Sequence, residues 1–424
     1  MSAEYDEITR FITNKKLKVM VSSPEYLNSN EEMLQNMQNL WCDFELAYCS
    51  NTGYNDKGKH YTDYADLDSM VSFWLVQEIM GNSDGSSKSR YAYLSEDGKI
   101  YFGPVWDFDW SAGSVAVGNE PNGWKCSLSE DNEDNFFKEW LDDPLFCLRA
   151  VEKYWEIRDY MEEITKRGGR IDTYAEYLFE SGCANEKMWR YLRGFSGADG
   201  DVEQLRNHLS YRIKWLDEQF ASVETLMESL RTSTSETPYG TDNQKIFMTA
   251  GNVIYHVEND SVSDSEYWYV NEDPNMTFRI SDKKAKYLAV YVNAKLAGHY
   301  EIHDNICGIS IPTEILTGKD AKDLVTLIAT DAKGKIAATN YFILMKGKGV
   351  GTRVVFADDQ GDILCEMLCF ANTSIPNHHP SLDGYGEKYT YYSNMECTKE
   401  YEWEEEVVLQ PMDIYVKYKI KYNT

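Results

Sequence analysis

The chain has 424 residues, 42% of them hydrophobic, and its 42 Lys and Arg against 70 Asp and Glu give a formal net charge of −28. This length exceeds one ordinary core, so we expect two to four domains. The acidic charge argues against DNA, RNA or an anionic membrane surface as the partner, because such partners select basic patches. No apolar run approaches the roughly 20 residues of a membrane span. Residues 1–16 lack the pattern of a secretory signal peptide.

The nine cysteines show no spacing typical of a disulfide framework. Cys42 and Cys49 would lie two helical turns apart, and Cys365 and Cys369 would lie four residues apart on one strand. A disulfide spans neither separation. Neither pair has His or Cys neighbours at the spacing of a zinc site. We therefore predict buried, reduced thiols.

Residues 1–231 are predicted to be mostly helical. Apolar residues recur every three or four positions in Asn30–Tyr48, and again between a predicted N-cap at Asp66 and a stop near Gly81. Two short extended runs, Arg90–Leu94 and Lys99–Phe102, flank the sequence Ser-Glu-Asp-Gly and predict a β-hairpin. Further helices are predicted at Phe136–Leu141, Leu145–Thr165, Tyr174–Ser181 and Val202–Leu230.

Strand patterns begin after a linker rich in Ser, Thr, Pro and Gly at Thr232–Thr241. Residues 242–346 alternate with a period of two and predict an all-β sandwich, whose turn placement resembles bacterial Ig-like modules. A Gly-rich linker, Lys346–Gly351, precedes residues 351–424, which resemble the small β-grasp-like repeats of bacterial surface proteins. The expected fold class is therefore α+β and multidomain. The predicted strands include Ile246–Met248, Val253–His256, Thr277–Ile280, Tyr287–Val292, Leu324–Ala329, Tyr341–Met345, Arg353–Phe356, Ile363–Met367 and Ile414–Tyr418.

Three carboxylates follow the predicted elements of the first domain. Asp84 comes just after the helix that stops near Gly81, and Asp107 and Asp109 come just after the hairpin. Carboxylates on neighbouring loops form a hard-oxygen site for Mg²⁺, Mn²⁺ or Ca²⁺. Phosphoryl transfer needs such an ion and a further carboxylate beside the attacking hydroxyl. The alternative is that Asp84 forms a turn and Asp107 caps the next element, and spacing alone leaves both interpretations open.

The sequence around these carboxylates resembles the CotH kinase-like family. These relatives of spore coat protein H are atypical protein kinases that are secreted or associated with the spore coat. The most specific part of the likeness is Tyr101–Asp109, Tyr-Phe-Gly-Pro-Val-Trp-Asp-Phe-Asp, and the resemblance covers about the first half of the chain. The other parts are Asp66–Ser69, Glu78–Asp84, Lys88–Ser89, Trp140–Phe146, Trp155, Trp189 and Arg212–Leu216.

The resemblance implies transfer of the γ-phosphate of ATP, with Mg²⁺ or Mn²⁺, to Ser or Thr hydroxyls of a secreted or surface protein. It implies that Asp84 is the catalytic carboxylate that orients the hydroxyl. Asp107 matches the metal ligand of a DFG-like motif, and Asp109, where a conventional kinase has Gly, is a second candidate ligand. Ser89 stands where a conventional kinase has the Asn that holds a second metal ion. The candidate cofactor-binding residues are Asn82, Lys88, Ser89 and Phe108.

A conventional kinase also has an N-terminal lobe with a Lys on the phosphates and a Gly-rich cover. The residues before Asp66 are predicted to be helical and contain no Gly-rich loop. We therefore expect the chain to be the downstream part of a larger kinase, with loss of that lobe as the alternative. Two functions stay open: a CotH-type kinase, or a catalytically inactive kinase-like scaffold at the cell surface. From the family we expect an extracytoplasmic location.

Overall fold

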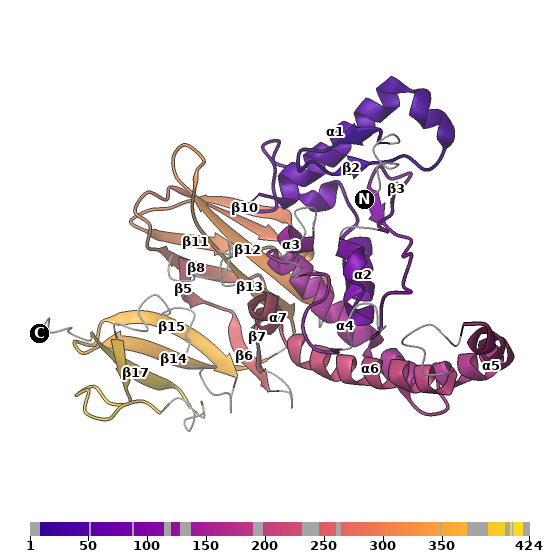
Figure 1. The fold of residues 1–424 in the computed structure, drawn as a ribbon. Helices are drawn as coiled ribbons and strands as arrows, with labels where there is room; N and C mark the ends of the chain where they lie inside the picture. Colours follow the sequence, from indigo (N-terminus) through magenta and orange to yellow (C-terminus); the bar gives the residue numbers. More distant parts are fainter. Residues whose placement is uncertain are drawn as a thin grey trace, which may run out of the picture. The chain divides into compact units, whose positions relative to one another are not determined.

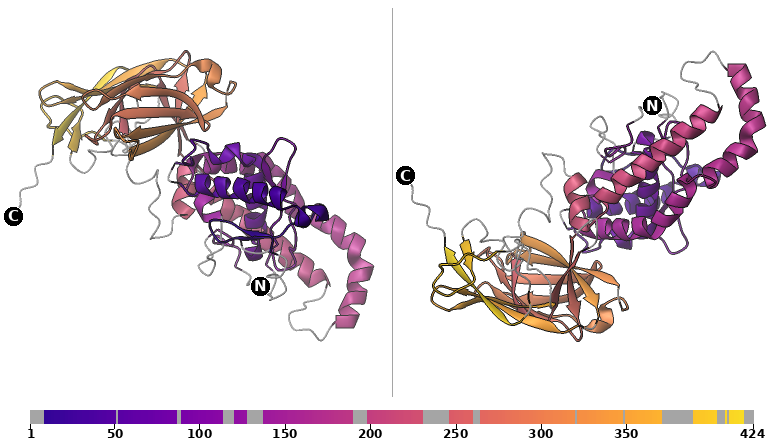
Figure 2. Two further views of the ribbon diagram at one scale, coloured as in Figure 1. Left: turned by 90° about the horizontal axis from the view of Figure 1, so that it is seen from above. Right: turned by 90° about the horizontal axis from the view of Figure 1, so that it is seen from below.

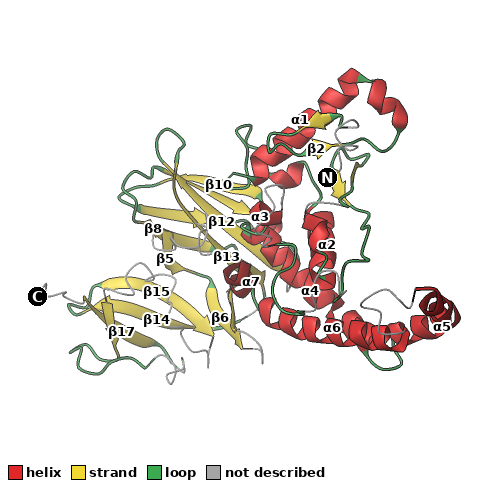
Figure 3. Ribbon diagram, in the orientation of Figure 1, coloured by secondary structure: helices red, strands yellow, loops and turns green. Residues whose placement is uncertain are grey.

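The structure is a computed structural model of the chain. It describes residues 9–50, 52–86, 89–113, 120–127, 137–189, 198–230, 246–259, 264–319, 321–347, 349–370, 389–402, 408 and 410–418. The chain divides into two compact units, Met1–Ser235 and Glu236–Thr424. Helices dominate the described part of the first unit and strands that of the second (Figures 1 and 3). The predicted α+β fold class is therefore confirmed, whereas the Ig-like and β-grasp-like assignments stay predictions.

The first unit combines helices with two short hairpins. Strands β3 (Ala92–Leu94) and β4 (Ile100–Phe102) pair in the predicted hairpin. Strands β1 (Phe11–Ile12) and β2 (Lys18–Val19) pair in a second hairpin that the sequence did not predict. The described part before Asp66 holds one α-helix and two short 3-10 helices besides this second hairpin, so the helical prediction is met only in part. The helices are α1 (Glu31–Tyr48), α2 (Leu67–Met80), α3 (Phe137–Trp140), α4 (Pro144–Thr165), α5 (Arg170–Trp189), α6 (Ala198–Gln219) and α7 (Val223–Leu230).

Helix α2 begins and ends where its sequence predicts. The Asp66 carboxylate accepts a hydrogen bond from the Ser69 backbone N–H at 2.8 Å, which satisfies one of the free donors of the first turn. Met70 and Trp74 on its inner face are fully buried. At its C-terminus Gly81 adopts a left-handed conformation, φ 63°, which glycine reaches without steric cost. These two ends fix the point at which the chain enters the Asp84 loop.

The prediction of one helix over Val202–Leu230 is wrong. The structure has α6 and α7 in this range, separated at Phe220–Ser222. The Ser222 hydroxyl accepts a hydrogen bond from the Thr225 backbone N–H at 3.1 Å and so caps a new helix. Apolar residues continue across the break at helical spacing, so the pattern alone does not show it.

The second unit contains a ten-stranded and a three-stranded sheet. The large sheet has the order β10-β9-β12-β13-β7-β6-β15-β14-β17-β16, and the small one β11-β8-β5. One core cluster draws buried residues from both sheets. The strands are β5 (Ile246–Gly251), β6 (Ile254–Asn259), β7 (Asp264–Val270), β8 (Asn275–Ile280), β9 (Tyr287–Val292), β10 (Lys295–Glu301), β11 (Ile306–Ser310), β12 (Lys322–Thr330), β13 (Ile336–Lys346), β14 (Gly351–Asp358), β15 (Ile363–Phe370), β16 (Tyr389–Tyr392) and β17 (Met412–Tyr418).

The large sheet continues through both predicted β domains. Strand β6 pairs in parallel with β15, with Ile254 opposite Leu368 and Tyr255 opposite Cys369. The buried core cluster likewise includes residues on both sides of the predicted linker, for example Leu344 and Val354. The division of this unit into 242–346 and 351–424 stays a prediction, and the two segments share a sheet and a core.

Among the described residues, no helix is both long and apolar enough to cross a membrane. All nine cysteines lie in the described part of the chain, and none of them forms a disulfide there. Cys126, Cys147, Cys307, Cys365 and Cys369 are buried, whereas Cys49 is exposed.

Candidate active site

The loop that follows α2 is held in place by a buried amide. Asn82 is fully buried, and its Nδ2 donates to Gln77 Oε1 at 2.9 Å and to the backbone oxygen of Asp107 at 3.4 Å. Gly85 packs so closely on Gln77 that an added Cβ would lie 2.4 Å from Oε1. A 3-10 turn at Ser83–Ser86 carries Asp84, which is half-buried. Asn82 thus joins the Asp84 loop to the Asp107 segment, although the two are distant in sequence.

The predicted metal ligand and the predicted second-metal position come together. Ser89 Oγ donates a hydrogen bond to Asp107 Oδ2 at 3.2 Å. Both residues have positive φ, 51° for Ser89 and 66° for Asp107, a conformation that L-residues adopt only where their surroundings require it. A second tie links the segments, because the Ala112 N–H donates to the Met80 carbonyl at 2.6 Å. The Asp107 segment is therefore fixed against both α2 and the Ser89 loop.

The three predicted carboxylates do not meet in one cluster. Asp107 and Asp109 are exposed and Asp84 is half-buried. Within the described ranges, no group of three or more His, Cys, Asp or Glu side chains could hold a metal ion. Phe108 is half-buried, and its carbonyl accepts a hydrogen bond from Ser111 Oγ at 2.6 Å. Lys88, the remaining candidate, lies outside the described residues, and the assignment of all these residues as a site stays a prediction.

Apolar side chains are unusually exposed around Asp107. Trp106, which directly precedes it, is 61% exposed and contacts Tyr91 edge to face, with ring centroids 6.5 Å apart. Val105 and Trp110 are also exposed. An aromatic face beside a carboxylate can stack on a planar ligand while the carboxylate binds a cation.

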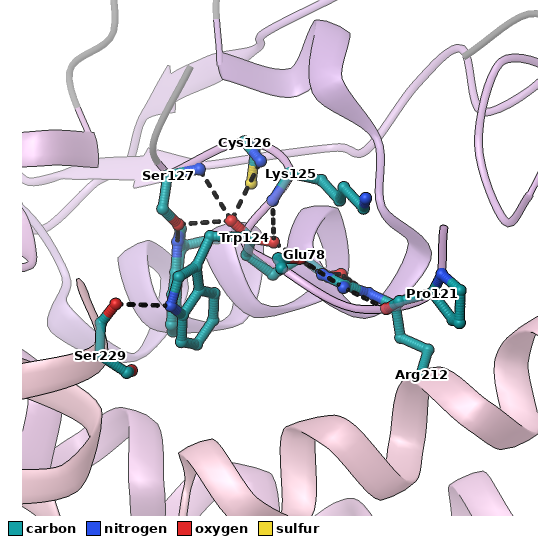
Figure 4. Close-up of polar contacts among 10 residues, drawn as sticks. Glu78, Pro121, Trp124, Lys125, Cys126, Ser127, Arg212 and Ser229 are labelled. Atoms are coloured by element: carbon teal, nitrogen blue, oxygen red, sulfur yellow. Dashed lines mark hydrogen bonds and ion pairs between the residues drawn. The ribbon is translucent and has the colours of Figure 1, made fainter. Parts of the chain in front are cut away.

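Sequence reasoning did not identify a fully buried ion pair beneath the site (Figure 4). Glu78, in the last turn of α2, and Arg212, in α6, are both 0% exposed. The Arg212 guanidinium donates to the Glu78 carboxylate at 2.9 Å and, through Nε and Nη2, to the Glu78 carbonyl at 2.9 and 2.7 Å. Its Nη1 donates to the carbonyls of Pro121 and Gly123 at 2.8 and 2.7 Å. Every N–H of Arg212 therefore has an acceptor.

The Glu78 carboxylate is equally well paired. Its oxygens accept hydrogen bonds from the backbone N–H groups of Lys125, Cys126 and Ser127 at 3.0, 3.0 and 2.7 Å, and from the Ser127 hydroxyl. Burial lowers the pKa of Arg212 and, more than any other effect, raises the pKa of the Cys126 thiol. We call Glu78, Arg212 and residues 121–127 the Glu78 network. It fixes the end of α2 from which Asn82 and Asp84 project.

One sequence signal could have revealed this network. Glu78 lies four residues after Trp74, and therefore on the same, buried face of α2. A carboxylate on a core face needs a cationic partner or several donors. The sequence does not name that partner, because Arg212 is 134 residues away.

No curated protein matches the chain. Two solved structures that match are "Structures of Clostridium thermocellum CbhA fibronectin(III)-like modules" and "X-ray structure of the endo-beta-1,4-mannanase from Thermotoga petrophila". The first is 13% identical, with a TM-score of 0.15, and the match covers 19% of this chain and 85% of that one. The second is 12% identical, with a TM-score of 0.16, and the match covers 36% of this chain and 25% of that one.

Such TM-scores assign no fold to the chain. The family comparison is informative, because the family described as CotH kinase protein matches residues 15–216. The match includes α1 to α5, most of α6, the Asp84 loop, the Asp107 segment and the Glu78 network. Residues 15–216, a little under half of this chain, are therefore similar to the CotH kinase family.

Proposed function

We propose that the first unit is the phosphate-transferring part of a CotH-type protein kinase. The observation that carries this proposal is the hydrogen bond between Ser89 and Asp107 beside the Asp84 loop, within a segment that matches the CotH kinase family. The proposed reaction transfers the γ-phosphate of ATP to a Ser or Thr hydroxyl of a protein. The hydroxyl oxygen forms a bond to the γ-phosphorus, the bond from that phosphorus to the bridging oxygen of ADP breaks, and the hydroxyl proton passes to a carboxylate.

The oxygens present suit Mg²⁺ or Mn²⁺. Asp107 offers an exposed carboxylate and Ser89 a hydroxyl 3.2 Å from it, and both are hard-oxygen ligands. Asn82 Oδ1 is a buried acceptor with no hydrogen-bond partner among the described residues. When bound, the metal ion would offset the negative charge on the phosphate oxygens. Few protein ligands are needed, because phosphates supply the others, so the lack of a three-residue cluster is compatible with this assignment.

The chain's own residues would divide the remaining work. Asp84 would accept the proton of the attacking hydroxyl and orient that hydroxyl. Asn82 would hold the backbone of Asp107, and through it the carboxylate, at a fixed position. Asp109 and Lys88 stay proposed ligands of the metal ion and the phosphates, and the exposed faces of Trp106 and Tyr91 could stack on the base of the nucleotide.

Calorimetry with Mg-ATP, together with a phosphotransfer assay on dephosphorylated casein, tests the proposal. Asp107→Asn is expected to weaken Mg-ATP binding at least about 10-fold. Asp84→Asn is expected to leave binding in place and to lower phosphotransfer about 100-fold or more. Asp159→Asn, at an exposed position of α4, serves as the matched control and should change neither. Phosphotransfer by the Asp107→Asn variant at the rate of the unaltered chain would contradict the assignment.

The second candidate function is a catalytically inactive, kinase-like scaffold at the cell surface. The observation that favours it is that Asp84, Asp107 and Asp109 form no metal-binding cluster among the described residues, and that Asp107 and Asp109 are exposed. Micromolar binding of Mg-ATP to the chain would contradict this candidate. For either function we propose an extracytoplasmic location, with the β-rich second unit displaying or spacing the first.

A further inference from the structure

Helices α4, α5 and α6 enclose a pocket that plays no part in the proposed phosphotransfer. Its volume is about 560 Å³, within the range of about 300–1,000 Å³ typical of small-molecule sites. Within the first unit, α5 extends away from the other helices (Figures 1 and 2). Most residues of the pocket lining lie on α5. Its lining includes none of the candidate active-site residues.

The pocket has an apolar base and an aromatic rim. Ile171 is buried in a small core cluster, and Ile164 and Leu205 are partly buried and pack against that cluster. Tyr174 and Phe179, both on α5, line the same pocket and are more than half exposed. Aromatic side chains that border an apolar hollow and face water favour a ligand that covers them.

The described lining of the pocket contains one charged side chain. Arg170, the first residue of α5, is the only charged residue of the lining. Its neighbours are paired, because Arg167 binds Glu203 and Arg206 binds Asp172. Within the described residues, no carboxylate pairs with the Arg170 side chain. A guanidinium next to an apolar hollow matches a carboxylate on an apolar body, since its planar N–H groups bind a carboxylate in two parallel hydrogen bonds.

We propose that this pocket binds a small amphipathic carboxylic acid, with the carboxylate on Arg170 and an aromatic or alkyl body against Tyr174, Phe179 and the apolar base. The ion pair sets the orientation of the ligand, and removal of apolar surface from water supplies most of the affinity. The pocket size limits the body to about the size of one or two fused rings or a medium-length alkyl chain. The proposal is independent of the phosphotransfer proposed above, because the two sites share no residue.

Two probes that share a naphthalene ring and differ in charge separate the contribution of the ion pair to binding from that of the apolar contact. Calorimetry with 2-naphthoate on the full chain is expected to give saturable binding with one site. Arg170→Gln should weaken 2-naphthoate binding about 10-fold, the loss expected for one charge-assisted pair, and should leave 2-naphthalenemethanol binding unchanged. Arg167→Gln is the matched control, three residues away and outside the lining, and should change neither.

A second pair of variants tests the location of the body. Phe179→Ser should weaken the binding of both probes. Tyr177→Ser, a control on α5 that is 84% exposed and outside the lining, should weaken the binding of neither. Equal effects of Phe179→Ser and Tyr177→Ser, or of Arg170→Gln and Arg167→Gln, would overturn the proposal. So would absence of saturable binding, including the case in which sedimentation shows that a second copy of the chain covers α5. A circular dichroism spectrum equal to that of the unaltered chain establishes that each variant is folded.

Discussion

The two sides of the last turn of α2 differ in how completely their polar atoms are paired. On one side, the Glu78 network buries two charges fully, and every N–H of Arg212 has an acceptor. On the other side, the Asp107 carboxylate is exposed and has one hydrogen bond, from Ser89, among those that the structure describes. Asn82 Oδ1 has no partner among the described residues. The C-terminal end of α2 therefore joins the Glu78 network, whose two charged side chains are fully hydrogen-bonded, to a loop that still has unpaired acceptors among the described residues.

This difference shows how a fold can hold a site that is not fully paired. Burial of an ion pair stabilises a structure only when its geometry and its other hydrogen bonds offset the cost of desolvation. The Glu78 network meets that condition and fixes the backbone from which Asn82 and Asp84 project. The loop can then leave acceptors free for a ligand, because its position does not depend on them.

The largest expected effect comes from breaking the network. Arg212→Met leaves the Glu78 carboxylate buried without its cation, so the free energy of unfolding should fall by about 3–5 kcal/mol. Arg149→Met, which removes an exposed pair with Asp68, should cost at most about 1 kcal/mol. Urea unfolding followed by tryptophan fluorescence measures both, since nine of the eleven tryptophans lie in the first unit. Equal losses in the two variants would show that the buried network adds nothing that a surface pair does not.

A second buried pair, less completely bonded, should respond to pH. His60 Nε2 lies 4.0 Å from Asp143 Oδ2, too far for a hydrogen bond, and Asp143 Oδ1 caps α4 at the Leu145 N–H. Burial lowers the pKa of His60 to about 3 and, opposed by a hydrogen bond from Tyr61, raises the pKa of Asp143 to about 6. Both side chains are therefore neutral near pH 5, unlike the charges of the Glu78 network.

The two pKa shifts change stability in opposite directions. Because the pKa of Asp143 is raised in the folded state, the stability it contributes is present below its ordinary pKa and is lost as pH rises through about 6. Because the pKa of His60 is lowered, the stability it contributes is present above about 6.5 and is lost as pH falls toward about 3. Between these limits the two contributions oppose each other in the unaltered chain.

Single variants should expose each contribution. Relative to the unaltered chain, Asp143→Asn should lose stability as pH falls from 6 to 4, by up to about 1.4 kcal/mol per pH unit. His60→Gln should gain stability over the same range. Urea unfolding at pH 6, 5 and 4 measures the slopes, and Asn at position 143 keeps a residue that caps helices well. Parallel slopes in the two variants would refute the assignment of opposite contributions.

The sequence predicted the local features of the site and not its long-range contacts. The N-cap at Asp66, the stop at Gly81 and the β3–β4 hairpin follow from residue types that favour those conformations. The pairing of Glu78 with Arg212 depends on packing between α2 and α6, and no periodicity in one sequence specifies which helices meet.

The limits in the second unit have a related cause. Strands β9 and β12 were predicted, with β12 one residue longer at its C-terminus and two at its N-terminus. Strand β10 was missed, because as the edge of the large sheet it is partly exposed and lacks a clear alternation. The sheet order, with β6 beside β15, joins segments more than 100 residues apart and cannot be inferred from local pattern.

The smallest expected effect concerns the backbone of the Asp107 loop. Asp107 has φ 66°, a conformation that costs free energy for any residue with a Cβ, although less for Asp and Asn than for other residues. Glycine has no Cβ and adopts this conformation without that cost. Asp107→Ala and Asp107→Gly both delete the carboxylate, so the difference between them isolates the backbone. Asp107→Ala should be less stable than Asp107→Gly by about 1 kcal/mol.

Asp109 provides the matched control, since its φ is not positive. There the order should reverse, with Gly less stable than Ala by about 0.5–1 kcal/mol, because glycine loses more conformational freedom on folding. Urea unfolding of the four variants decides the matter. The same order at both positions would mean that the positive φ of Asp107 carries no energetic cost. The difference between the Glu78 network and the Asp107 loop would then rest on their hydrogen bonding alone.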